Sequence, residues 1–137
     1  MIKMICTNSD GGSRGNPGLA GIGILVRKNE SIIETYSEKI GKATNNEAEY
    51  MALIRALQLA ATYTKDELVC YLDSELIVKQ LLGKYQVKNK RLLKFFLEIQ
   101  KLQNNFNKIS YIHVSREDPF QQIADALLNI ELDNKGK

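Results

Sequence analysis

The sequence predicts an α/β domain built on one mixed sheet, antiparallel on one side and parallel on the other. Two observations carry this prediction. Three apolar, strand-like segments follow one another near the N-terminus, which is typical of an antiparallel meander. From residue 44 onward, segments with helical periodicity alternate with short apolar runs, which is typical of helices that connect parallel strands.

The first three strands are expected at residues 2–9, 19–28 and 31–40. Residues 10–18 are rich in Gly, Asn and Pro, so they should form a loop between the first two strands. The polar residues 28–30 mark the turn before the third strand. The chain therefore opens with a three-stranded meander.

The later elements follow from helix caps and from apolar spacing. Thr44 and Glu47 have the spacing of a capping box, so a helix should begin here and run to about Tyr63. Glu49 lies one turn before the apolar stripe of this helix and extends the face that should meet the sheet. The remaining elements are a strand at 68–72, a short helix at 76–81 stopped by Gly83, a helix at about 88–104, a strand at 109–114, a loop at 115–120 and a helix from Ala124 to about Leu132.

Length and composition are those of one ordinary domain, with 137 residues of which 44% are hydrophobic. We expect a single domain at residues 1–132 and a disordered tail at 133–137. No run of apolar residues is long enough to span a membrane, and the N-terminus lacks the order of a signal peptide. These features favour a cytoplasmic protein without a membrane partner, and we expect a monomer.

Three acidic residues are expected at the ends of secondary structure elements. Asp10 and Asp73 follow strands, and Glu49 lies in a first helical turn. If the first and fourth strands are neighbours, the three carboxylates converge at the edge where α/β sheets place their sites. Converging carboxylates repel one another unless cations compensate them, and a set of oxygen donors suits Mg²⁺ better than zinc. Two such ions can support phosphodiester hydrolysis, although each acid alone also fits an ordinary surface or capping role.

Three further features of the sequence can each be interpreted in two ways. The Gly-rich segment 10–18 lacks the Lys-Ser or Lys-Thr ending of a Walker loop, yet its backbone amides could admit a phosphate or ribose. His113, the only histidine, fits a structural role or proton transfer. A basic cluster fits a solvated helix face or a nucleic acid contact, and the net charge of +3 is compatible with the latter. The cluster consists of Lys84, Lys88, Lys90, Arg91 and Lys94.

Four segments, in order along the chain, resemble the signature of the type 1 ribonuclease H family, which includes ribonuclease HI and the reverse-transcriptase-like ribonuclease H domains. They are Asp10 to Gly18 (DGGSRGNPG), Thr44 to Glu49 (TNNEAE), Leu72 to Ser74 (LDS) and Ala124 to Leu127 (ADAL). The resemblance implies the ribonuclease H-like fold, a five-stranded mixed sheet with three antiparallel strands, then two parallel ones, and helices on both faces. It also implies endonucleolytic hydrolysis of the RNA strand of RNA–DNA hybrids, which leaves 5'-phosphate and 3'-hydroxyl ends.

The same resemblance implies particular site residues. Asp10, Glu49, Asp73 and Asp125 would hold two Mg²⁺ ions, with Mn²⁺ as an alternative and with Asp10 bridging both. His113 would help the product or a proton to depart. Backbone groups of Gly11 to Ser13 would meet ribose 2'-hydroxyls, and Thr44 would meet a DNA phosphate. The expected substrate contacts are Gly11, Gly12, Ser13, Asn16, Thr44, Asn45, Asn46, Ser74, Lys84, Lys88 and Lys90.

The sequence departs from the family pattern in two places. The spacing from His113 to Asp125 is longer than usual, and Gln121 stands where an asparagine is common. The region after Asp73 is too short for a full basic protrusion, whose work the basic cluster would share. Two alternatives remain at this stage: a domain that binds hybrids without cutting them, and an exonuclease or resolvase of the same fold superfamily.

Overall fold

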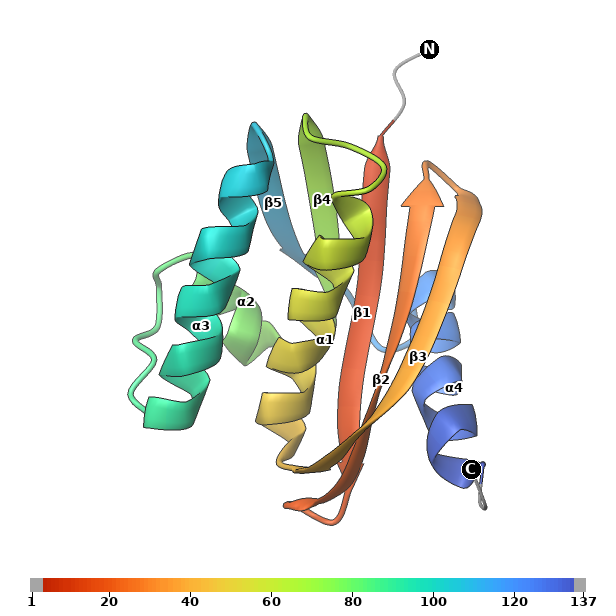
Figure 1. Cartoon of the computed structure of the whole chain (residues 1–137), viewed down its shortest axis with the longest axis vertical. Helices are drawn as coiled ribbons and strands as arrows, with labels where there is room; N and C mark the ends of the chain where they lie inside the picture. The colour runs from red at the N-terminus through yellow and green to blue at the C-terminus, as the bar shows by residue number, and fades with distance from the viewer. Residues whose placement is uncertain (1–3, 135–137) are drawn as a thin grey trace.

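The computed structural model describes residues 4–134 and arranges them as a five-stranded sheet with helices on both faces (Figure 1). The strand order is β3-β2-β1-β4-β5, with antiparallel pairing among β1, β2 and β3 and parallel pairing of β4 with β1 and β5. The strands are β1 (Ile5–Arg14), β2 (Gly18–Lys28), β3 (Ser31–Ala43), β4 (Glu67–Leu72) and β5 (Lys108–His113). The predicted mixed sheet is therefore confirmed.

Helices cover the sheet unequally. In Figure 1, α1 and α3 lie on one face and α4 lies on the other. The helices are α1 (Asn45–Ala60), α2 (Glu75–Leu81), α3 (Lys90–Leu102), which continues into a short 3-10 turn (Gln103–Asn105), and α4 (Pro119–Asp133). The main core lies on the α1 side, where side chains such as Leu53, Leu68 and Ile99 are completely buried. Burial of this apolar surface provides the principal driving force for folding.

The start of α1 has the predicted capping box. The hydroxyl of Thr44 accepts from the backbone N–H of Glu47 at 3.1 Å, and the Glu47 carboxylate accepts from the backbone N–H of Thr44 at 2.8 Å. These two bonds satisfy backbone donors that a helix leaves free at its N-terminus. The helix ends at Ala60, earlier than the predicted Tyr63.

Two predicted boundaries were wrong. β1 continues through most of the predicted loop, because residues 10–14 pair with residues 19–23 of β2 in one hairpin. The last helix begins at Pro119 rather than at Ala124. Asp118 caps it by accepting from the N–H groups of Phe120 and Gln121, and proline suits the first helical position because its missing N–H would have no partner there.

The predicted tail begins inside α4. Asp133 is the last helical residue and forms an ion pair with Arg14, so the expectation of disorder was wrong at this position. The carbonyl of Asn134 accepts a hydrogen bond from Lys39 at 2.6 Å. Residues 135–137 of the predicted tail, and residues 2 and 3 of the first predicted strand, lie outside the described residues. Between residues 4 and 134, no helix combines the length and hydropathy needed to cross a membrane.

Candidate active site

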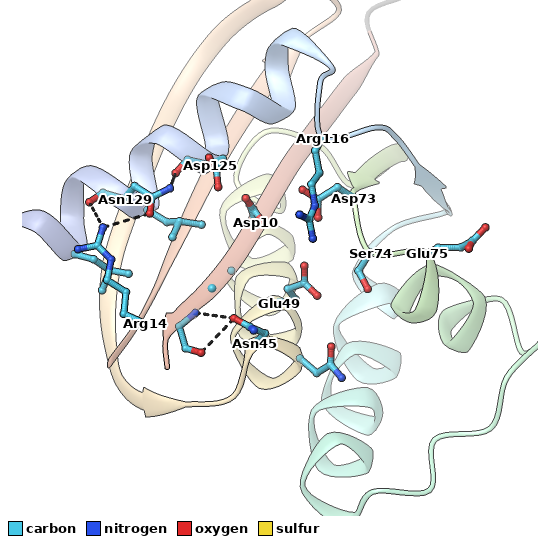
Figure 2. Close-up of a pocket in the computed structure, with 16 residues that line it drawn as sticks. Asp10, Arg14, Asn45, Glu49, Asp73, Ser74, Glu75, Arg116, Asp125 and Asn129 are labelled. Carbon is cyan, nitrogen blue, oxygen red and sulfur yellow. Dashed lines mark hydrogen bonds between the residues drawn. The ribbon is translucent and has the colours of Figure 1, made fainter. Parts of the chain in front are cut away.

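The sheet opens at the carboxyl end of β4. The parallel ladder between β1 and β4 runs as far as the pair Asn8 and Tyr71, and two residues further along each segment lie Asp10 and Asp73. Beyond this point β1 remains paired with β2 alone, while the chain after β4 enters α2. A depression of about 610 Å³ occupies the opening, and its lining includes Asp10, Glu49, Asp73 and Asp125 (Figure 2).

A glycine on the α1 face brings Glu49 to this opening. A Cβ atom on Gly11 would lie 2.2 Å from the carbonyl oxygen of Ala48, which is far too close. Only glycine therefore lets the first turn of α1 touch β1 here. Because Glu49 directly follows Ala48, this close approach carries the glutamate to the strand that bears Asp10.

A second glycine does the same for α4 on the opposite face. Gly23 pairs with Asp10 across the hairpin, and a Cβ atom on Gly23 would lie 2.1 Å from the carbonyl oxygen of Ala124. Because Asp125 directly follows Ala124, the absence of a side chain at Gly23 brings Asp125 beside Asp10. Asp10 therefore sits where two helices approach the sheet from opposite faces.

The carboxylates form a tight cluster. Asp10, Glu49 and Asp73 each present an oxygen atom such that the three oxygens lie within 4.8 Å of one another. Burial, the charge of Asp73 and a hydrogen bond with Asp125 raise the pKa of Asp10 to about 9. Burial and Asp73 raise the pKa of Glu49 to about 8. The pKa of Asp73 is also raised, mainly by burial.

These residues fit a divalent cation that prefers oxygen ligands. The donors are carboxylates alone, without a histidine or cysteine, and the raised pKa values of Asp10 and Glu49 report that the folded protein disfavours their shared negative charge. A cation held by Asp10, Glu49 and Asp73 would remove this cost. Mg²⁺ and Mn²⁺ both favour such a donor set.

Ser74 and Arg116 support the cluster from either side. The Ser74 hydroxyl caps α2, and Ser74 also lowers the pKa of the Glu49 carboxyl. Arg116 lies between β5 and α4, lines the depression, and lowers the pKa of Asp73 and of Glu49. Figure 2 places its guanidinium beside Asp73. The sequence analysis did not single out Arg116, although a cation in the short segment after His113 was a usable signal.

His113 lies at the end of β5 with an exposed side chain, outside the residues that line the depression. Its role in proton transfer therefore stays a prediction from the resemblance.

The predicted substrate contacts fall around two depressions. Gly11, Gly12, Ser13 and Ser74 line the depression of the acidic cluster. Asn16 and Thr44 line a second one near the N-terminal ends of α1 and α3, and Asn45 and Asn46 belong to both.

Internal hydrogen bonds fix part of this surface. The side-chain oxygen of Asn45 accepts from the backbone N–H of Ser13 at 2.9 Å, and that of Asn16 accepts from the backbone N–H of Asn45 at 3.0 Å. Both asparagines thus tie the β1–β2 hairpin to α1.

The basic residues lie on one exposed segment. Lys84, Lys88 and Lys90 are exposed between α2 and the start of α3, and they line neither depression. Their neighbour Arg91 does line the second depression and contacts the buried carboxylate of Glu47 at 2.7 Å. The sequence analysis placed Arg91 in the basic cluster but not among the site residues. Arg91 and Glu47 lie far apart in the sequence, so the sequence did not predict this ion pair.

Comparison with known proteins places these features in a family. A family model described as reverse transcriptase-like matches residues 8–129. Ribonuclease HI of Halobacterium salinarum is 40% identical over 126 residues, which cover 91% of this chain and 62% of that protein. A bifunctional protein of Mycobacterium tuberculosis is 38% identical over 131 residues, which cover 94% of this chain and 35% of that protein. The chain thus spans less than two thirds of the length of these relatives.

Solved structures agree closely with the fold. The crystal structure of RNase H1 from Halobacterium salinarum superimposes with a TM-score of 0.89 at 37% identity, covering 95% of this chain and 98% of that one. LC11-RNase H1, solved in complex with an RNA/DNA hybrid, gives a TM-score of 0.87 at 37% identity, covering 94% and 96%. The chain therefore belongs to the reverse-transcriptase-like, type 1 ribonuclease H family.

Proposed function

We propose that this chain is a metal-dependent endoribonuclease that hydrolyses the RNA strand of RNA–DNA hybrids. The observation that carries the proposal is the convergence of Asp10, Glu49 and Asp73 within 4.8 Å, at the floor of an open depression beside Asp125. Family membership supports it, since a relative is named ribonuclease HI and a similar structure contains an RNA/DNA hybrid.

The four acids would hold two divalent ions, and Asp10 would be the ligand common to both. When bound, the ions supply the Lewis acidity that generates a nucleophile from water at neutral pH and that stabilises the leaving oxygen. Ser74 and Arg116 lower the pKa of Glu49, and Arg116 lowers that of Asp73, so both neighbours favour the ionised, ligating forms against the effect of burial. Water oxygen joins the phosphorus as the bond to the 3'-oxygen breaks, so the products carry a 5'-phosphate and a 3'-hydroxyl.

Two residues, one at the end of β5 and one after it, act on the reacting phosphate. Arg116 faces the cluster, so its guanidinium is suited to a charged hydrogen bond with a phosphate oxygen. His113 keeps the proton-transfer role toward the 3'-oxygen that the resemblance implies. This role requires the exposed imidazole to reach the bound substrate from the end of β5.

Selectivity for hybrids comes from the two depressions together. Backbone groups of Gly11, Gly12 and Ser13 border the cluster and are suited to ribose 2'-hydroxyls, which distinguish RNA from DNA. In the second depression, the Thr44 hydroxyl accepts from α1 and so keeps its proton for a DNA phosphate. The remaining contacts that we propose are Asn16, Asn45, Asn46, Ser74, Lys84, Lys88 and Lys90.

The test is a cleavage assay on labelled RNA–DNA hybrid, double-stranded RNA, double-stranded DNA and single-stranded RNA, each with Mg²⁺, with Mn²⁺ and with chelator. We expect metal-dependent cutting of the hybrid's RNA strand alone, at internal positions. The Asp10→Asn variant should fold and lose cleavage, because it removes the shared charge at nearly constant volume. Retention of hybrid without cutting would make the chain a binding module, and stepwise trimming would make it an exonuclease.

A further inference from the structure

A chain of three buried polar side chains lies beneath the acidic cluster, on the α4 side of the sheet. Asn8 of β1, Arg27 of β2 and Gln121 of α4 are exposed by only 1%, 7% and 0% of their surface. Polar groups buried to this extent are costly unless each finds a hydrogen-bond partner. Their arrangement is therefore constrained by the bonds that they form.

The bonds run in one direction, from the arginine to the active site. Arg27 Nε donates to Asn8 Oδ1 at 2.9 Å, and Asn8 Nδ2 donates to Gln121 Oε1 at 3.1 Å. Gln121 Nε2 donates to the backbone carbonyl of Ser9 at 2.8 Å. Gln121 also lowers the pKa of the Asp73 carboxyl, against the effect of burial.

Arginine sets this direction because its side chain has donors and no acceptor. Asn8 must turn its oxygen toward Arg27, and its NH₂ group then faces Gln121. Gln121 must in turn present its oxygen to Asn8 and its NH₂ group to the site. An amide that could otherwise point either way is thus fixed with its NH₂ group toward the carbonyl of Ser9.

Arg27 itself is held firmly in place. Its Nη1 donates to the carbonyl of Asn29 at 2.6 Å, and its guanidinium lies 3.9 Å from the ring centre of Phe120 and 5.4 Å from that of Tyr71. Within residues 4–134 it forms no ion pair with a carboxylate. Its donor to Asn8 is therefore not drawn away by a competing acid.

Gln121 also lies where the pairing between β1 and β4 has ended. Ser9 follows the last residue of β1 that pairs with β4, so β4 no longer offers a partner to the backbone at this point. The amide of Gln121 takes up this position, because it donates to the backbone carbonyl of Ser9 on the strand that carries Asp10. It thus connects α4, which bears Asp125, to the strand that bears Asp10.

We propose that Gln121 is a positioning residue that ties α4 to the strand of Asp10, so that Asp10 and Asp125 keep their ligating geometry, and that Arg27 directs its amide through Asn8. The proposal rests on the metal site of the proposed function. Gln121 does not touch the reacting atoms; it acts through the backbone next to Asp10.

The first test replaces the amide and keeps the volume, with Gln121→Met. Calorimetric titration with Mn²⁺, without nucleic acid, should give an affinity roughly 10-fold to 100-fold weaker than that of the unchanged protein, as is usual when an outer-shell group that supports a metal site is removed. Gln122→Met alters the exposed neighbouring residue of the same helix and should bind Mn²⁺ as the unchanged protein does. Equal affinity of the two variants would overturn the proposal. Failure of the unchanged protein to bind Mn²⁺ would instead overturn the proposed function and this assignment with it.

The second test reverses the direction of the amide with Asn8→Asp. The new carboxylate can pair with Arg27, so we expect stability against urea to be kept. Its second oxygen attracts the NH₂ group of Gln121 away from Ser9, so Mn²⁺ affinity should fall. The negative charge that Asn8→Asp adds near the site would by itself tighten Mn²⁺ binding. Weaker binding by this variant would therefore have to come from the turned amide and not from the added charge.

The double variant Asn8→Asp with Gln121→Met completes this cycle. With no amide left to turn, Asn8→Asp should cause no further loss of Mn²⁺ affinity. Tighter binding by Asn8→Asp alone, or equal losses in both backgrounds, would show that the direction of the amide does not matter and would overturn the role of Arg27.

Discussion

Asp10 is a carboxylate that the folded protein disfavours as an anion. Its side chain is 8% exposed, and burial together with Asp73 and Asp125 raises its pKa to about 9, compared with 3.8 for an unperturbed aspartate. The folded protein therefore keeps a proton that the unfolded chain releases. In the absence of metal, the contribution of protonated Asp10 to the free energy of unfolding is fully present below a pH of about 4. This contribution is lost as the pH rises through about 9.

Asp10→Asn should consequently stabilise the metal-free protein. In chelator at pH 8, we expect its melting temperature to exceed that of the unchanged protein by roughly 5 °C, which corresponds to about 1–2 kcal/mol for a domain of this size. The difference should shrink as the pH is lowered toward 4. Asp66→Asn, at an exposed position just before β4, serves as the control for the loss of one carboxylate. A melting temperature below that of the unchanged protein at pH 8 would contradict the electrostatic argument.

Arg116 is the cation that faces the cluster, so its loss should be costly for catalysis. Arg116→Ala should reduce kcat/KM on hybrid by roughly 10-fold to 100-fold, the worth of one charged hydrogen bond. His113→Ala, measured in parallel, should cost less because the imidazole lies outside the depression. Steady-state kinetics in which His113→Ala is the more damaging change would return the larger role to the histidine.

The sequence was sufficient to place some of the site residues but not others. Asp10, Glu49 and Asp73 could be predicted to converge because each is tied to a strand or helix whose place in the sheet follows from its pattern. Gln121 and Arg116 could not, because their contacts depend on the path of the segment between β5 and α4. Hydrophobic periodicity and helix caps are local patterns, and they do not predict which distant residues such a connecting segment contacts.

At the scale of elements, two glycines set how closely helices approach the sheet. Gly11→Ala and Gly23→Ala would each place a methyl group within 2.2 Å of a helix carbonyl, so the helix or the strand must move. We expect each to cost more than about 2 kcal/mol in the free energy of unfolding by urea. Gly12→Ala is the matched control, since its methyl would meet only a Leu128 side-chain atom at 3.6 Å. Equal stability of the three variants would show that the sheet and helices adjust freely.

Element types were predictable, but two boundaries were not. Composition suggested a loop at residues 10–18, yet pairing with β2 keeps residues 10–14 extended. Glycine is unfavourable in an isolated strand, and here the hairpin partner and the two helices that need close contact outweigh that preference. At α4, Asp118 and Pro119 were the stronger start signal, and the later apolar spacing obscured it.

At the scale of the whole molecule, the basic segment between α2 and α3 should determine how salt affects binding. Replacing Lys84, Lys88 and Lys90 together with glutamine should flatten the slope of log affinity against log salt by up to about 2, as expected for phosphate contacts. Filter binding in chelator measures this without cleavage.

The control replaces three lysines near the opposite end of the sheet, Lys28, Lys65 and Lys108, for an equal change of net charge. Equal slopes for the two triple variants would assign the effect to net charge alone.

The placement of β1 at the middle of the sheet has a consequence for synthesis. The central strand and Asp10 leave the ribosome well before Asp125, which belongs to the last helix described. This helix packs against Gly23 on the neighbouring strand β2. The four acids can therefore come together only after α4 has been synthesised, so a growing chain that ends before α4 carries an incomplete site.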